Sequence, residues 1–314
     1  MTHASNSALS VQYDLRPAKQ VERRMMLDAF QRLAQATFPI RDYRYTGFGS
    51  LFFVDFLIFH KMLGINDMLS IEHDPTLELR VKYNSPFRFI EVKIAEATDV
   101  IPTLSPDKLH ILWLDYDWPV TGAILNDIYL AGSQLSRGSI LLITVDVEPP
   151  DKESEEPRAS KNYFEREAGR YLSLVEIGDY AKSNLNKISK MVIMNALKEG
   201  MVARRNLDYY PLFYFDYADG HRMMTLGGVI GSQVEKGKLN SINKEGAEYL
   251  RMGINDNPYE IKVPVFTRKE RHMLDSAMPC PDGWQPNDFP VPPEYIQAYR
   301  EIYRFLPSYA ELLV

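Results

Sequence analysis

A glycine-containing turn and a carboxylate one helix further along the chain are the residues best suited to chemistry in this sequence. Gly47 and Gly49 follow one expected strand, and Glu72 ends the next. Glycines let the backbone turn sharply and approach a ligand closely. A carboxylate roughly 20 residues after them is placed to accept hydrogen bonds from ribose hydroxyls. This spacing predicts a site for an adenosine-containing cofactor.

A pair of carboxylates, Asp115 and Asp117, ends the apolar stretch LHILWLDYDWP. Alternate residues of a strand point to the same face, so both carboxylates would lie together. Like charges at this spacing are costly without a partner, which favours binding or proton transfer from an attacking hydroxyl or amine. The adjacent Trp118 could stack on a flat ligand or belong to the core. A divalent metal is the less favoured alternative because no third ligand is evident, and no metal site is predicted.

Alternating strand and helix patterns must position these residues. Strands are expected at about 43–46, 67–72, 87–94, 109–117 and 139–147. Helices are expected from Pro17 onward, at about 51–63, after Asp74-Pro75, and at about 122–135. Apolar strands that alternate with helices predict a parallel sheet covered by helices on both faces.

The pattern changes after residue 150. A long helical region is expected at about 163–198, followed by two strands joined at Asp219-Gly220, a strong hairpin signal. Such a hairpin would add two antiparallel strands to one edge of the sheet. Helices are expected again at about 267–276 and 293–304.

The expected architecture is therefore an α/β, Rossmann-like fold. It has a mostly parallel seven-stranded sheet, an antiparallel final hairpin and helices on both faces. Residues 1–40 form an N-terminal leader and helix, and 41–235 form the cofactor-binding and catalytic domain, with a helical insertion at 151–205. Residues 236–314 form a C-terminal extension.

This outline resembles the class I S-adenosylmethionine-dependent methyltransferases. The segments YRYTGFGSLFFVDF, SIEHD and LWLDYD are similar to bacterial proteins labelled as O-methyltransferases, over most of residues 15–150. The resemblance implies the Rossmann-like methyltransferase fold, S-adenosylmethionine as the cofactor and an enzyme that methylates a substrate the sequence does not identify.

The resemblance also implies roles for individual residues. The turn TGFGS matches the first cofactor motif, and Glu72 and Glu96 match the acids that contact ribose and the adenine amino group. The expected cofactor contacts are Tyr45, Gly47, Gly49, Ser50, Asp55, Glu72 and Glu96. The expected catalytic or substrate-orienting residues are Asp115, Asp117 and Trp118.

One departure from the family pattern concerns the methionine end of the cofactor. The family usually carries an acid just before the first glycine, whereas Arg44, Tyr45 and Thr46 stand there in this chain. That end would then be held by Asp55 or by groups on the first helix. The departure leaves open a non-methylating, Rossmann-like component of a bacterial complex, for example in defence. A nicotinamide-dependent oxidoreductase ranks lowest, because the fourth strand and the hairpin fit methyltransferases better.

Composition excludes several classes of protein. The 314 residues are 45% hydrophobic and 25% charged, which is typical of a globular protein. Cys280 is the single cysteine, so neither an internal disulfide nor a cysteine-based zinc cluster can form. The N-terminus has no secretory pattern, and the longest apolar run, SLFFVDFLIF, is too short to span a bilayer. A cytoplasmic location without a membrane partner is expected.

Partners other than the substrate are only weakly indicated. The formal net charge of −6 does not point to nucleic acid, although a local basic groove stays open. The tyrosine-rich end AYREIYRFLPSYAELLV could pack on its own domain or on a second subunit. A homodimer through the C-terminal extension is the corresponding expectation.

Overall fold

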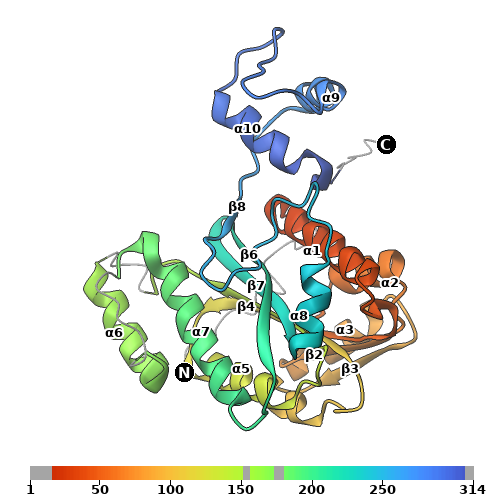
Figure 1. Ribbon diagram of the computed structural model, residues 1–314, viewed down its shortest axis with the longest axis vertical. Coiled ribbons are helices and arrows are strands. Elements are labelled where there is room, and N and C mark those ends of the chain that lie inside the picture. Colours follow the sequence, from red (N-terminus) through yellow and green to blue (C-terminus); the bar gives the residue numbers. More distant parts are fainter. Residues whose placement is uncertain (1–15, 151–155, 173–179, 308–314) are drawn as a thin grey trace.

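The computed structural model describes residues 16–150, 156–172 and 180–307 (Figure 1). Within them the strands form one sheet in the order β3-β2-β1-β4-β5-β7-β6-β8. Strands β1 to β5 are parallel, β7 is antiparallel to β5 and β6, and β8 is parallel to β6. The strands are β1 (Arg44–Gly47), β2 (Asp67–Glu72), β3 (Ile90–Ile94), β4 (His110–Pro119), β5 (Ile140–Asp146), β6 (Asp208–Asp219), β7 (His221–Gly231) and β8 (Tyr259–Ile261).

The sheet confirms the expected mixed α/β fold and extends it by one strand. The predicted hairpin is present, with Gly220 in the turn between β6 and β7 at a φ of 94°. The sequence predicts seven strands, whereas the described residues contain an eighth, β8, which pairs with β6 from Phe215 to Tyr217. A three-residue strand is too short to show a two-residue periodicity, so the sequence pattern does not reveal it.

Helices cover both faces of the sheet (Figure 1). Side chains of α1, α2, α3 and α8 belong to the apolar cluster on one face, and those of α4, α5, α6 and α7 to the cluster on the other. The helices are α1 (Pro17–Gln35), α2 (Val54–Leu63), α3 (Glu78–Asn84), α4 (Ala97–Val100), α5 (Gly122–Gln134), α6 (Pro157–Ala168), α7 (Leu185–Met201), α8 (Gln233–Asn240), α9 (Arg268–Ala277) and α10 (Pro293–Ile302).

Strand β4 shows how the sequence divides between the two faces. Ile111 and Trp113 pack in the cluster that contains α1, whereas Leu112 and Leu114 pack in the cluster that contains α5. This alternation continues past the buried part of the strand. It turns the Asp115 side chain toward α1, where it contacts Lys19.

The insertion after β5 forms a helical layer on α5. Within the predicted helical region, α6 and α7 are separate helices, and residues 173–179 between them lie outside the described residues. Helices α5 and α7 approach closely because Gly132 faces Leu197, where a Cβ would lie 2.8 Å from the carbonyl oxygen. The insertion therefore packs on the sheet's α5 face.

The C-terminal region has two parts. Its first part, with α8 and β8, packs on the main sheet, where Leu239 and Tyr259 join the core. Its second part, with α9 and α10, has a small core of its own around Leu274, Ile296 and Tyr299. Figure 1 shows this second part projecting from the body at the top of the view. No helix among the described residues is long and apolar enough to cross a membrane.

Candidate functional site

A cavity of ≈ 290 Å³ opens at the carboxyl ends of the first four strands. Ligands of open α/β sheets bind at this edge, outside the ends of parallel strands. Seven segments contribute to its wall. The polar and aromatic lining residues include Arg23 from α1, Ser50 after β1, Asp55 from α2, Glu72 at the end of β2, His73 just after it, Glu96 after β3, Asp115, Tyr116, Asp117 and Trp118 from β4, and Asp127 from α5.

The turn after β1 brings Ser50, but neither predicted glycine, to the cavity wall. Gly47 and Gly49 have ordinary φ angles, whereas Ser50 and Phe53 adopt positive φ values of 47° and 50°. Glycine is required at both positions because neighbouring side chains leave no space for a Cβ. A Cβ at Gly47 would lie 2.5 Å from the Tyr45 hydroxyl, and one at Gly49 would lie 2.8 Å from the Phe53 ring. Their part in cofactor contact stays a prediction.

Tyr45 lies in the core and supports the site from behind. Its side chain is fully buried, and its hydroxyl donates a short hydrogen bond to Asp55. Burial raises the pKa of the Asp55 carboxyl, while the nearby Arg23 guanidinium and the Tyr45 hydroxyl act in the opposite direction. Tyr45 is thus placed to orient Asp55, which itself lines the cavity.

Glu72 ends β2 with its side chain 7% exposed at the cavity wall. Its Oε1 accepts a hydrogen bond of 2.9 Å from the backbone N–H of Asp74 and lies 3.3 Å from His73 Nδ1. The carboxylate is therefore held in place before any ligand arrives. This is the position expected for a ribose contact, and the role stays a prediction.

The wall near β3 and α5 carries one expected acid and one that sequence reasoning missed. Glu96 precedes α4 and lines the cavity with an exposed side chain. Asp127 is buried and accepts hydrogen bonds from Tyr116 (2.7 Å) and Thr98. Burial raises the pKa of Asp127, and those two donors oppose the shift. Asp127 was missed because its position in a helix does not reveal which wall it faces.

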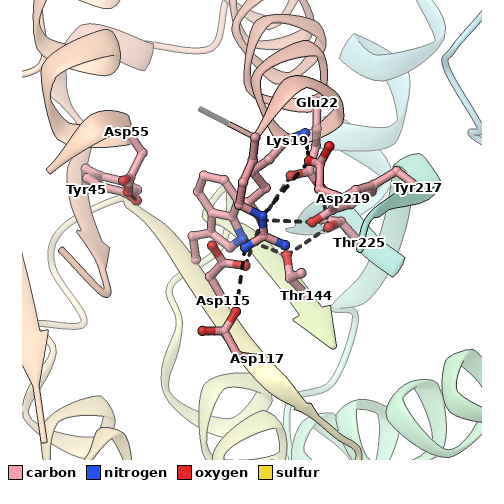
Figure 2. Close-up of polar contacts among 12 residues, drawn as sticks. Lys19, Glu22, Tyr45, Asp55, Asp115, Asp117, Thr144, Tyr217, Asp219 and Thr225 are labelled. Carbon is pink, nitrogen blue, oxygen red and sulfur yellow. Dashed lines mark hydrogen bonds and ion pairs between the residues drawn. The ribbon is translucent and has the colours of Figure 1, made fainter. Parts of the chain in front are cut away.

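Asp115 is one end of a buried polar network (Figure 2). It accepts a hydrogen bond of 2.8 Å from Lys19 Nζ, which also donates to the Tyr217 hydroxyl at 3.0 Å and lies 3.0 Å from Glu22. The Lys19 ammonium sits 4.6 Å from the centre of the Trp113 ring. The carboxylate pair expected to repel is thus partly compensated by a lysine from another element.

The pKa directions in this network follow from burial and charge. Burial alone would lower the pKa of Lys19, but the carboxylates of Asp115 and Glu22 outweigh it and raise the pKa. Burial raises the pKa of Glu22, and Lys19 and the Thr225 hydroxyl oppose that shift. Thr225 in turn shares a hydrogen bond of 2.8 Å with Thr144. The network therefore ties α1 to β4, β5, β6 and β7.

Asp117 and Trp118 lie further out along β4. The Asp117 carboxylate is 4.0 Å from an Arg16 guanidinium nitrogen, and Arg16 also lies 4.0 Å from Asp219. The Trp118 side chain lines the cavity and is 54% exposed. Asp115, Asp117 and Trp118 thus share one wall with the expected cofactor contacts Asp55 and Glu72.

Sequence reasoning missed the charged residues of α1. Lys19, Glu22 and Arg23 are 1%, 0% and 3% exposed. They lie three and four residues apart, in phase with the buried Met26 and Phe30. Charges on the apolar stripe of an amphipathic helix are the available signal, because such groups are rarely buried unless paired. Among the described residues, no group of three or more histidine, cysteine and acidic side chains could hold a metal ion.

Comparison with known proteins identifies a family. A family model described as "Putative O-methyltransferase" matches residues 11–314. The comparison with curated protein sequences produced no match.

Solved structures with a similar fold include several methyltransferases. Trm1 from Pyrococcus horikoshii, in complex with S-adenosyl-L-methionine, is 12% identical, with a TM-score of 0.43 and coverage of 82% of this chain and 72% of its own. The plantazolicin methyltransferase BamL, in complex with SAH, is 10% identical, with a TM-score of 0.43 and coverage of 72% and 91%. The O-methyltransferase TomG from Streptomyces achromogenes is 14% identical, with a TM-score of 0.38 and coverage of 67% and 80%.

Proposed function

We propose, because the chain belongs to the family described as Putative O-methyltransferase, that it transfers a methyl group from S-adenosylmethionine to a nucleophile held at the end of β4. The observation that carries the proposal is one cavity whose wall joins Glu72, Arg23 and Asp115. An acid at the end of β2 suits a ribose, and a buried guanidinium suits a carboxylate.

In this proposal, each part of the cofactor is bound by a different residue of the cavity wall. Glu72 would accept hydrogen bonds from the ribose hydroxyls, and Glu96 would accept from the adenine amino group. Arg23 would bind the carboxylate of the methionine end, and Asp55 would bind its ammonium. This assignment replaces the family's usual acid before the first glycine. It uses α1, a helix that precedes the sheet in sequence and packs on one of its faces.

The main contribution of the chain to this reaction would be to position the two reactants. The bound cofactor supplies an electrophilic methyl group on a sulfonium. Asp115 is held by Lys19, so its carboxylate keeps one orientation toward the cavity. Asp117, whose side chain is more exposed than that of Asp115, would accept the proton that the acceptor loses. Holding both reactants in line accounts for most of the rate in this proposal.

Calorimetric titration tests the cofactor assignment. Wild-type protein is titrated with S-adenosylmethionine, S-adenosylhomocysteine and NAD, and the same ligands are added to Glu72→Gln and Arg23→Met. We expect the two sulfur ligands to bind the wild type and each variant to weaken them at least about tenfold, which corresponds to about 1.4 kcal/mol. Glu245→Gln, an exposed loop residue, is the matched control.

Three results would count against the proposal. Binding of NAD in place of the sulfur ligands would favour an oxidoreductase, and binding of no ligand would remove the cofactor assignment. Tight binding of S-adenosylhomocysteine without methyl transfer to any acceptor in cell extract would instead favour the non-methylating component.

A further inference from the structure

We propose that the acceptor is an amine, bound as its ammonium form between Asp117 and Trp118. This inference rests on the proposed function, since it names the substrate class of the same cavity. It starts from two observations about the cavity wall. Trp118 is 54% exposed, and both Trp118 and Asp117 line the cavity. An aromatic face and a carboxylate together are suited to an organic cation.

The charge of the wall agrees with a cationic acceptor. The described lining residues include carboxylates from α2, β2, β4 and α5, and Arg23 is the one lysine or arginine among them. Lys19 and Arg16 contact Asp115 and Asp117, but neither belongs to the lining. When Arg23 and Asp55 are engaged with the methionine end, no lysine or arginine is left among the described lining residues, and Lys19 and Arg16 offset only Asp115 and Asp117. Carboxylates close to an acceptor favour its cationic form and disfavour an anionic form.

The movement of charge during methyl transfer separates amines from hydroxyls. An ammonium acceptor first gives a proton to Asp117. The neutral nitrogen then forms the new N–C bond while the S–C pair returns to sulfur, so the positive charge moves from sulfur to nitrogen. A negative wall stabilises that nitrogen as it becomes positive. A hydroxyl acceptor would approach the transition state with a partly anionic oxygen, which the same wall would destabilise.

Fluorinated probes of matched shape test this inference. Protein saturated with S-adenosylhomocysteine is titrated with 4-fluorobenzylamine and with 4-fluorobenzyl alcohol, and binding is followed by fluorine NMR. We expect the amine to bind at least about fivefold more tightly, the ratio that about 1 kcal/mol of cation–π and charge attraction supplies. In Asp117→Asn the two probes should come within about twofold of each other, and Trp118→Ala should weaken the amine more than the alcohol.

Controls separate this inference from the proposed function. Asp107→Asn removes the same charge from an exposed residue before the amino end of β4 and should keep the wild-type ratio. Asp117→Asn should bind S-adenosylhomocysteine as the wild type does, which shows that the cavity is intact. Equal or tighter binding of the alcohol, or binding of neither probe to the saturated protein, overturns the amine assignment. Failure to bind S-adenosylhomocysteine at all is instead a failure of the proposed function.

Discussion

Lys19 is a buried cation whose partners belong to α1, β4 and β6. Asp115, Glu22 and the Tyr217 hydroxyl lie within 3.0 Å of its ammonium, and the Trp113 ring lies 4.6 Å away. Removing one partner from such a group leaves the others charged and desolvated. Lys19 therefore supports the end of β4, which carries the candidate proton acceptors Asp115 and Asp117. The sequence pattern alone places Lys19 in an ordinary helix.

Lys19→Met is expected to destabilise the fold by about 3 to 5 kcal/mol at neutral pH, because Asp115 and Glu22 lose their buried cation. The deficit should shrink as the pH falls. In the folded protein the pKa of Glu22 is already raised, chiefly by burial, and loss of Lys19 raises it further. A carboxyl with a raised folded pKa costs stability as the pH rises from its unfolded pKa, about 4.3, to the folded value.

Denaturant titrations at about pH 7.5 and about pH 5.5 measure this dependence. Lys61→Met, at an exposed position of α2, is the control and should change stability by less than about 0.5 kcal/mol. An equal deficit at both pH values would mean that Lys19 supports the fold through packing and not through charge.

At the scale of elements, the turn between β1 and α2 is built by contacts within the chain. Gly49 lies against Ser70 of β2 and the ring of Phe53, which precedes α2. Among the described residues, no hydrogen-bond partner of Ser70 Oγ is present, so that hydroxyl can be removed at little cost. The glycine thus sets how closely the turn, which carries Ser50 to the cavity, can approach the second strand.

Gly49→Ala is expected to cost about 1 to 3 kcal/mol, because the added methyl group overpacks this contact. It should also weaken S-adenosylhomocysteine binding, since Ser50 and the start of α2 must shift. Ser70→Ala alone should be close to neutral, and in the double variant it should recover at least about 0.5 kcal/mol. Thermal and denaturant unfolding of the four proteins complete the cycle. Strict additivity would show that the methyl group meets a different obstacle, such as the Phe53 ring.

At the scale of the whole molecule, the last part of the chain is built as a separate unit. Tyr299 is 1% exposed, its hydroxyl donates to Asp275 at 2.5 Å, and its ring meets Phe266 edge-on at 5.6 Å. After α10 the chain returns to the body, where Phe305 joins the core that contains α1. The unit is thus attached to the body yet holds α9 and α10 with its own core. A homodimer through this region stays a prediction.

Tyr299→Ala is expected to open α9 and α10 without disturbing the cavity. Removal of a buried aromatic ring costs about 3 to 5 kcal/mol, more than a core of this size can lose. Hydrogen exchange should accelerate in peptides from both helices and stay unchanged in α5, while S-adenosylhomocysteine affinity stays at the wild-type value. Tyr295→Ala, at a residue 41% exposed on α10, is the milder control. A loss of ligand affinity in Tyr299→Ala would show that the unit and the cavity are coupled.

The sequence by itself determined the succession of strands β1 to β7 along the chain, the hairpin, and the carboxyl ends of the strands as the place of Glu72 and Asp115. Those features depend on periodicity and on residues close together in the chain, such as the Asp219-Gly220 turn. Tertiary structure decided which distant groups meet. Lys19 and Asp115 are 96 positions apart, and only the packing of α1 on the sheet brings them to 2.8 Å. It also placed Tyr45 in the core and left no space for a side chain at Gly47. Both outcomes depend on what packs behind a strand, and the local sequence pattern does not contain that information.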